Sequence, residues 1–233
     1  MPRHAGVVAV TCLALEARIA RGPGVSVLCN HSLELANGLR AAIARGVSGI
    51  ISFGIAGGLA PNLAPGDWVV ASGVRSGDDL IATDRPWTQR LLDVLPGAVH
   101  AEVTGADAVI VTAVEKRDLH QETGAAAVDM ESHIAAKIAA EYHIPFVACR
   151  VVIDPAHRTL PPAATLGLRL DGTPDVSAVL RSLRQKPGQF PDLVRIASDA
   201  YIARRALRSG RRQLGVGMGF PYYNDFSSDL AVA

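Results

Sequence analysis

Several residue types are scarce in this 233-residue chain, and each scarcity excludes a class of protein. The three cysteines, Cys12, Cys29 and Cys149, are odd in number and form no CxxC or zinc-binding spacing. This favours reduced thiols in a cytoplasmic protein and predicts no metal site. Basic and acidic residues nearly cancel at 23 and 22, which argues against nucleic acid as the main partner. No apolar run approaches the ~20 residues that a membrane-spanning helix needs.

Aromatic residues are also scarce, at 5% of the chain, whereas hydrophobic residues as a whole make up 49%. Because Ala, Val, Leu and Gly dominate, the composition suits close-packed helices on a sheet better than an all-β sandwich. The chain contains no internal repeat and no linker. The sequence therefore predicts one domain over residues 1–214, followed by a loose tail over 215–233.

Apolar runs and stretches with helical spacing alternate along the chain, which predicts an α/β fold. We expect a three-layer α/β/α sandwich around a central mixed, largely parallel twisted sheet. Since Glu16 and Arg18 follow the N-terminal apolar run at once, that run is interpreted as a buried strand rather than a signal peptide. The expected strands are 6–15, 25–29, 49–54, 68–73, 98–103, 109–111, 126–130 and 145–153. The expected helices are 33–45, 88–95, 132–142, 176–183 and 191–209, and residues 16–20 lead into a helix or loop.

Three segments place small or charged residues at the ends of expected strands, where open α/β sheets bind ligands. The glycine-rich residues 54–59 let a backbone approach a ligand, but they match neither a P-loop nor a dinucleotide pattern. Residues 128–132 carry two carboxylates that, taken alone, are explained as a helix cap and a first-turn acid. Residues 149–155 hold a buried Arg150, which needs an acidic partner such as Glu131 or Asp154.

The order of these segments, G-x-A-G-G-L, then V-D-M-E, then R-x-x-x-D, resembles the purine and uridine phosphorylase superfamily. That superfamily includes the methylthioadenosine/adenosylhomocysteine nucleosidases, and the resemblance covers residues 6–155. It implies an enzyme that breaks the bond between a purine base and a ribose. It also implies a homo-oligomer that needs no cofactor, with inorganic phosphate as the one candidate co-substrate.

The resemblance also implies a role for each site residue. Asp154 matches the general acid that protonates the base at N7, and an apolar strand end can supply the raised pKa that such an acid needs. Glu131 matches the glutamate that holds the ribose hydroxyls and stabilises an oxocarbenium-like state. Met130 matches the methionine that packs under the sugar, and Arg150 is expected to orient the carboxylates. The remaining substrate-binding positions are Asp129, Ile55, Ala56, Gly57, Gly58, Val109 and Ile153.

Three departures from the family pattern make the expected pocket more apolar. Ile55 stands where relatives often carry Ser or Thr, and Ile153 stands where they often carry Ser. Val109 replaces a phenylalanine that stacks on the base, which weakens the case for recognition of the base by stacking.

The nucleophile is a fourth departure. A gap-free comparison puts Arg18 where the nucleosidases carry the glutamate that activates water, and Glu16 lies two residues earlier. Since a guanidinium binds phosphate in a bidentate manner, Arg18 slightly favours phosphorolysis, although hydrolysis stays open.

The C-terminal half resembles one branch, the hopanoid-associated phosphorylases or adenosylhopane nucleosidases, through residues 154–164, residues 167–172 and the basic stretch 181–212. This branch implies removal of adenine from adenosylhopane, a lipid-linked nucleoside, and the basic stretch fits contact with an anionic membrane surface. The alternatives are a methylthioadenosine/adenosylhomocysteine nucleosidase or other small-nucleoside phosphorylase, a non-catalytic nucleoside-binding relative, and a peripheral membrane protein.

Overall fold

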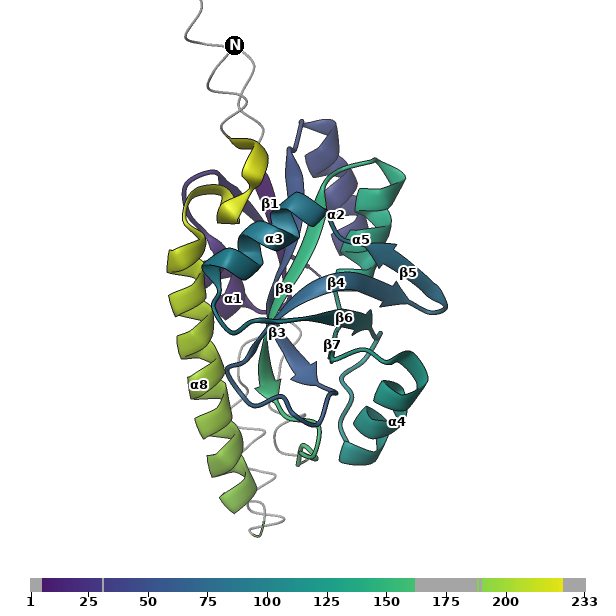
Figure 1. Cartoon of the computed structure of the whole chain (residues 1–233), viewed down its shortest axis with the longest axis vertical. Coiled ribbons are helices and arrows are strands. Elements are labelled where there is room, and N and C mark those ends of the chain that lie inside the picture. Colours follow the sequence, from purple (N-terminus) through teal and green to yellow (C-terminus); the bar gives the residue numbers. More distant parts are fainter. Residues whose placement is uncertain (1–5, 31, 162–187, 189, 224–233) are drawn as a thin grey trace, which may run out of the picture.

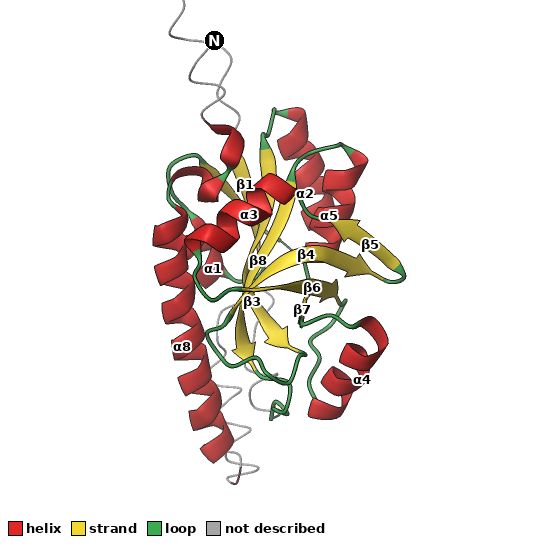
Figure 2. Cartoon of the chain, viewed as in Figure 1, coloured by secondary structure: helices red, strands yellow, loops and turns green. Residues whose placement is uncertain are grey.

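The computed structural model describes residues 6–30, 32–161, 188 and 190–223. Its elements form three layers, with one central sheet between two sets of helices (Figures 1 and 2). The strands are β1 (Val7–Thr11), β2 (Val25–Cys29), β3 (Gly49–Gly58), β4 (Trp68–Ser76), β5 (Asp79–Ala82), β6 (Val99–Gly105), β7 (Ala127–Asp129) and β8 (Phe146–Asp154). The helices are α1 (Ala14–Ala20), α2 (Ser32–Ala44), α3 (Arg85–Val94), α4 (Ala113–Thr123), α5 (Ser132–Glu141) and α8 (Phe190–Leu214), followed by the short 3-10 turns η2 (Val216–Gly219) and η3 (Pro221–Tyr223).

The sheet is mixed and largely parallel, in the order β2-β1-β3-β7-β6-β4-β5, as the sequence predicts. β8 lies off this path and pairs with both β3 and β4, so that β3, β7, β6, β4 and β8 close into a ring. Only β3–β7, β4–β5 and β4–β8 are antiparallel pairs among the described strands. Closure of the ring brings the C-terminal ends of β3, β7 and β8 together, and this is where the three sequence segments meet.

Each face of the sheet has its own apolar core. One core takes Leu35 and Leu39 from α2 and Ile138 from α5. The other takes side chains from α1, α3 and α8, including Trp87 and Leu207. Because the strands are covered on both faces, they read as continuous apolar runs rather than alternating ones. The expected α/β/α sandwich is confirmed.

The structure corrects the expectation of a strand at residues 109–111. That segment has no regular structure, and it leads into α4, which the sequence analysis missed along with β5. α4 lacks an apolar stripe, since Lys116 is its buried side chain. A signal for it was present, because Thr112 and Glu115 form a capping box and Gly124 ends the helix in the left-handed conformation.

The C-terminal segment also departs from expectation up to Tyr223. Met218 and Phe220 are buried, and the indole Nε1 of Trp87 donates a hydrogen bond of 3.0 Å to the Met218 carbonyl. The Trp87 and Phe220 rings meet edge to face with centroids 4.9 Å apart. Residues 215–223 therefore pack against α3 instead of forming a loose tail. Residues 224–233 and the expected helix 176–183 lie outside the described residues.

The expected helix 191–209 is longer in the structure, where α8 runs along one side of the molecule (Figure 1). Within the described residues, no helix combines the length and the apolar composition that crossing a membrane requires.

Candidate active site

A pocket of about 220 Å³ opens at the converging ends of β3, β7 and β8. The arrowheads of β3 and β8 lie between α8 and α4 in Figure 1, and α8 contributes to the pocket wall. The walls combine apolar side chains with four carboxylates. The lining residues are Cys12, Leu13, Ile55, Ala56, Gly57, Ala108, Val109, Ile110, Val128, Asp129, Met130, Glu131, Ile153, Asp154, Leu160, Ile196 and Asp199.

Glycines allow these segments to come close together. Gly57 pairs with Val128 of β7 and, past a bulge, with Asp154 of β8. A Cβ atom at Gly54 would lie 2.5 Å from Glu16 Oε1 and 2.8 Å from Arg150 Nη1, too close for either side chain. Glycine is thus required at position 54 because charged side chains pack directly on the β3 backbone. The residues 54–58 that the sequence predicts as a turn are the end of this strand.

One guanidinium organises the inner end of the pocket. Arg150 is fully buried, and its Nε lies 2.7 Å from Asp129 Oδ2, while its Nη2 lies 3.6 Å from Glu131 Oε2. Its Nη2 also donates to the Ser52 hydroxyl, which accepts a 2.9 Å hydrogen bond from Ser132. The acidic partners of Arg150 are therefore Asp129 and Glu131. Of the two candidates that the sequence suggested, Glu131 faces Arg150 and Asp154 does not.

Asp129 holds the first turn of α5 in place. Its Oδ1 accepts hydrogen bonds from the backbone N–H groups of Glu131 at 3.0 Å and Ser132 at 2.8 Å. Its Oδ2 pairs with Arg150 and accepts the Ser132 hydroxyl. Asp129 thus satisfies the helix N-terminus and the buried arginine together, which fixes the direction of the Glu131 side chain.

Glu131 lies in the pocket wall and is almost fully buried. Burial raises the pKa of its carboxyl, and Asp129 raises the pKa further, whereas Arg150 opposes both effects. Cys12 lines the same wall next to Glu131, a neighbour that the sequence analysis did not identify. Burial and the nearby Glu131 raise the pKa of the Cys12 thiol far above its usual range, so the thiol stays protonated.

Neither residue expected at the nucleophile lines the pocket. Both oxygens of Glu16 accept backbone N–H groups, from Cys12 and Leu13 at 2.8 Å and from Ile55 at 2.7 Å. Arg18 is exposed on α1. Residues two positions apart on an α-helix point in directions that differ by about 200°. Arg18 therefore points away from the side that Glu16 occupies. Glu16 instead ties the start of α1 to β3.

Asp154 is paired with a lysine that the sequence analysis missed. Lys116 of α4 is fully buried, and its ammonium contacts Asp154 Oδ2 directly. The same ammonium donates to the backbone carbonyls of Pro155 at 3.3 Å and Arg158 at 3.1 Å. Burial raises the pKa of Asp154, and Lys116 offsets part of that rise. No sequence pattern links positions 116 and 154, so only the fold brings them together.

A second ion pair borders the pocket through Asp199. Arg158 Nη2 is 2.9 Å from Asp199 Oδ2, and it joins the loop after β8 to α8. Asp199 and Ile196 line the pocket together with Leu160 from that loop. α8 is therefore part of the site, which the sequence analysis did not anticipate.

Most residues of the expected site line this one pocket. Asp129, Met130, Glu131, Ile55, Ala56, Gly57, Val109, Ile153 and Asp154 all line the pocket. Gly58 does not line it and instead packs against Val152 and the backbone of Asp154. Arg150 lies behind the wall. Within the described residues, no group of three or more His, Cys, Asp or Glu side chains could hold a metal ion.

Comparison with known proteins places this arrangement in a family context. A family model described as the phosphorylase superfamily matches residues 24–183, which is more than half of the chain. A search of curated proteins finds no match.

Several solved structures share the fold. Futalosine hydrolase of Helicobacter pylori is 14% identical with a TM-score of 0.65, over 92% of this chain and 97% of that one. The methylthioadenosine/adenosylhomocysteine nucleosidase of Colwellia psychrerythraea, in complex with adenine, is 18% identical with a TM-score of 0.59, over 66% and 84%. The Helicobacter pylori nucleosidase of the same name, with butyl-thio-DADMe-Immucillin-A, is 13% identical with a TM-score of 0.61, over 91% and 100%. At these identities the likeness shows the fold alone.

Proposed function

This chain belongs to the phosphorylase superfamily, and we propose that it is an enzyme that breaks the N-glycosidic bond of a purine nucleoside. One observation carries the proposal. Asp154 and Glu131, two buried carboxylates with raised pKa, line the same pocket from different strand ends. A glycosidic bond is broken by an acid for the leaving group together with a carboxylate that stabilises a cationic sugar, and this pair can supply both functions.

The two carboxylates have separate tasks in the proposed reaction. Asp154 gives its proton to N7 of the purine as the bond from the base to C1′ of the sugar breaks. The base then leaves as a neutral molecule instead of an anion. Glu131 accepts hydrogen bonds from the ribose hydroxyls, and its negative charge stabilises the oxocarbenium-like sugar. Met130 packs against the sugar, and Arg150 with Asp129 keeps Glu131 in position.

We favour water over phosphate as the nucleophile. Among the described residues that line the pocket, four are carboxylates and none is Arg or Lys. A phosphate anion would meet repulsion in such a pocket. Arg18, which favoured phosphorolysis in the sequence, is exposed outside it. Phosphate is therefore the less favoured co-substrate, and no cofactor enters the proposed reaction.

The proposed substrate is an adenine nucleoside with an apolar 5′ substituent, in the first place adenosylhopane. The apolar lining of Val109, Ile110, Leu160 and Ile196 supports this choice, since it offers contacts to a hydrocarbon. The main alternative substrate is methylthioadenosine or adenosylhomocysteine, the substrates named for two of the similar structures. A non-catalytic relative that binds a nucleoside is the second alternative.

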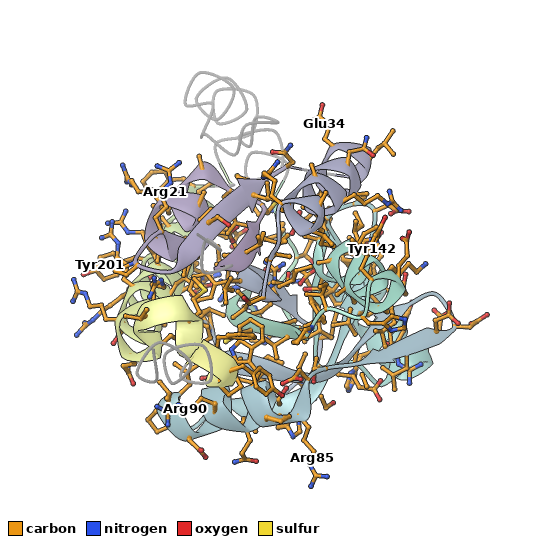
Figure 3. The ribbon with its side chains drawn as sticks, turned by 90° about the horizontal axis from the view of Figure 1, so that it is seen from above. Arg21, Glu34, Arg85, Arg90, Tyr142 and Tyr201 are labelled. Atoms are coloured by element: carbon orange, nitrogen blue, oxygen red, sulfur yellow. The ribbon has the colours of Figure 1, made fainter. Side chains whose placement is uncertain are left out.

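The exposed face of α8 supports contact with an anionic membrane surface. Arg195, Arg204, Arg205 and Arg208 are exposed there, and Tyr201 points outward from the same helix (Figure 3). Basic side chains next to exposed aromatic and aliphatic ones are typical of membrane-surface helices. We propose a cytoplasmic homo-oligomer that visits the membrane to reach a lipid-linked nucleoside.

Release of adenine tests the function and separates the substrates. The purified protein is incubated with adenosylhopane in vesicles or with methylthioadenosine, each with and without phosphate. We expect release from adenosylhopane without phosphate, and the same rate for Arg18→Ala. Release from methylthioadenosine alone would contradict adenosylhopane as the substrate. A strict requirement for phosphate would contradict water as the nucleophile. No release from either substrate would favour the non-catalytic alternative.

Vesicle binding tests the proposed membrane contact separately. Binding to anionic vesicles should weaken as salt is added and after replacement of Arg204, Arg205 and Arg208 by Gln. Vesicle binding that neither added salt nor the three substitutions weaken would contradict an electrostatic contact with the membrane.

A further inference from the structure

The lysine next to the acid is not explained by binding of the nucleoside. Lys116 has no exposed surface, and its ammonium contacts Asp154 Oδ2 and two backbone carbonyls of the loop that follows β8. A buried ammonium is costly unless it is paired and hydrogen-bonded, and here all three of its donors have an acceptor. The fold therefore places a fixed positive charge against one oxygen of the proposed acid.

The other oxygen of Asp154 has a different environment. Oδ1 makes no hydrogen bond to any described residue, whereas Oδ2 is held by Lys116. Asp154 lines the pocket, and its side chain keeps 12% of its surface exposed. The carboxyl is thus anchored at Oδ2 in the wall of the pocket, and Oδ1 is the oxygen that no described residue holds.

We propose that Lys116 is a positioning residue for the proton donor: it anchors Oδ2 of Asp154, so that Oδ1 carries the proton, and it stabilises the carboxylate left after transfer. This inference rests on the proposed function.

Atoms and electrons balance in the step that follows from this arrangement. The Oδ1–H bond of Asp154 breaks as the H–N7 bond forms, and the electron pair stays on the carboxylate beside the Lys116 ammonium. The electron pair of the glycosidic bond moves to the purine, which leaves neutral. Water attacks C1′ and loses a proton, which restores the Asp154 carboxyl.

Three charged groups face Asp154, each from a different element. Lys116 lies on α4, Arg158 on the loop after β8 and Asp199 on α8. Lys116 and Arg158 lower the pKa of the Asp154 carboxyl, whereas Asp199 and burial raise it. Lys116 makes the direct contact, so its removal should change the acidity of Asp154 more than removal of Arg158.

The kinetic test uses Lys116→Met, which removes the positive charge and keeps the approximate length of the side chain. In Lys116→Met, the rate should stay high to more alkaline pH, because Asp154 without its ammonium stays protonated longer. We expect the alkaline fall of kcat to move up by about 1 to 3 pH units. Since a weaker acid transfers its proton more slowly, kcat near pH 7 should fall about 10-fold, with KM changed much less.

Matched variants exclude a purely structural effect. Arg117→Met changes an exposed neighbour on the same helix and should behave like the wild type. Lys116→Gln keeps a hydrogen-bond donor without the charge, and should shift the alkaline limb in the same direction if Lys116→Met does not fold. In a protein that already carries Asp154→Asn, Lys116→Met should cost no further activity. An equal loss of rate at every pH, or an additive loss in the double variant, would overturn the proposal.

A measurement without substrate separates this inference from the proposed function. In protein labelled with ¹³C at aspartate carboxyls, the resonance of Asp154 is identified by its absence in Asp154→Asn. Its midpoint of titration should lie at higher pH in Lys116→Met than in the wild type. If the wild type releases no adenine, the proposed function fails, and this titration still decides the effect of Lys116. Equal midpoints would overturn the inference.

Discussion

Two charged clusters flank the pocket, and they differ in the ratio of positive to negative groups. Around Arg150, one guanidinium faces three carboxylates, those of Glu16, Asp129 and Glu131. Around Asp154, by contrast, two cations and two carboxylates alternate. The first cluster has an excess of acceptors, which suits a ligand that brings hydroxyl donors. The second is balanced, which suits a group that must gain and lose one proton.

The two clusters also differ in how the chain assembles them. The Arg150 cluster comes from the sheet ends and the first turns of α1 and α5. The Asp154 cluster draws its cations and Asp199 from α4, a loop and α8, which pack around the sheet. Changes in the first cluster should therefore affect stability strongly, and changes in the second should mainly affect the pH dependence of the reaction.

Arg150→Met should produce the largest effect. It leaves three buried carboxylates without their counter-charge, and we expect a loss of about 3–5 kcal/mol in the free energy of unfolding. Urea denaturation measures this loss. Arg204→Met, which removes an exposed arginine of α8, is the control and should change stability by less than about 0.5 kcal/mol. If the Arg150 variant were as stable as the control, a structural role for this cluster would be contradicted.

Asp154→Asn should follow, with its effect on catalysis. Asn keeps the shape of the side chain but donates no acidic proton, so adenine release should fall about 100-fold or more. Asn is preferable to Ala here, because Ala would leave the buried Lys116 ammonium without its partner. Circular dichroism checks that the fold is retained. Near-normal turnover in a folded variant would show that the proton comes from another group.

Glu131→Gln should slow adenine release and yet stabilise the protein at neutral pH. Because burial raises the pKa of Glu131 in the folded state, its contribution to stability is present at low pH and is lost as pH rises through that pKa. At pH 8 the variant should therefore have a higher melting temperature than the wild type, and its free energy of unfolding should be larger by about 1 kcal/mol. The difference should be smaller at pH 4. A lower melting temperature at pH 8 would mean that the ion pair with Arg150 outweighs burial.

Arg158→Met should have the smallest effect of the four. Its side chain is 20% exposed, and it pairs with Asp199 of the pocket wall. Loss of a partly solvated pair typically costs less than about 1 kcal/mol. The alkaline limb of kcat should still move slightly upward, because Arg158 lowers the pKa of Asp154. A shift larger than that in Lys116→Met would mean that Arg158 affects the pKa of Asp154 more than Lys116 does.

Much of the fold was predictable because buried strands are apolar throughout. β1, β2, β3, β4, β6, β7 and β8 overlap expected strands, and α2, α3, α5 and α8 overlap expected helices. α4 was missed because its buried side chain is a lysine, which breaks the apolar spacing that helix prediction relies on. The packing of residues 215–223 was missed because Met218 and Phe220 occur among glycines and prolines, where no periodic pattern can form.

The sequence by itself determined the family motifs and therefore the cluster of Asp129, Met130 and Glu131 at one strand end, with Arg150 and Asp154 on another strand. Residues so close along one strand keep fixed relative positions, so their spacing is informative. Only the tertiary structure decided that Glu16 binds backbone amides, that Arg18 is exposed, and that Lys116 pairs with Asp154 across 38 positions. Contacts between distant segments depend on how helices pack against the sheet, and a single charged side chain leaves no periodic signal for that packing.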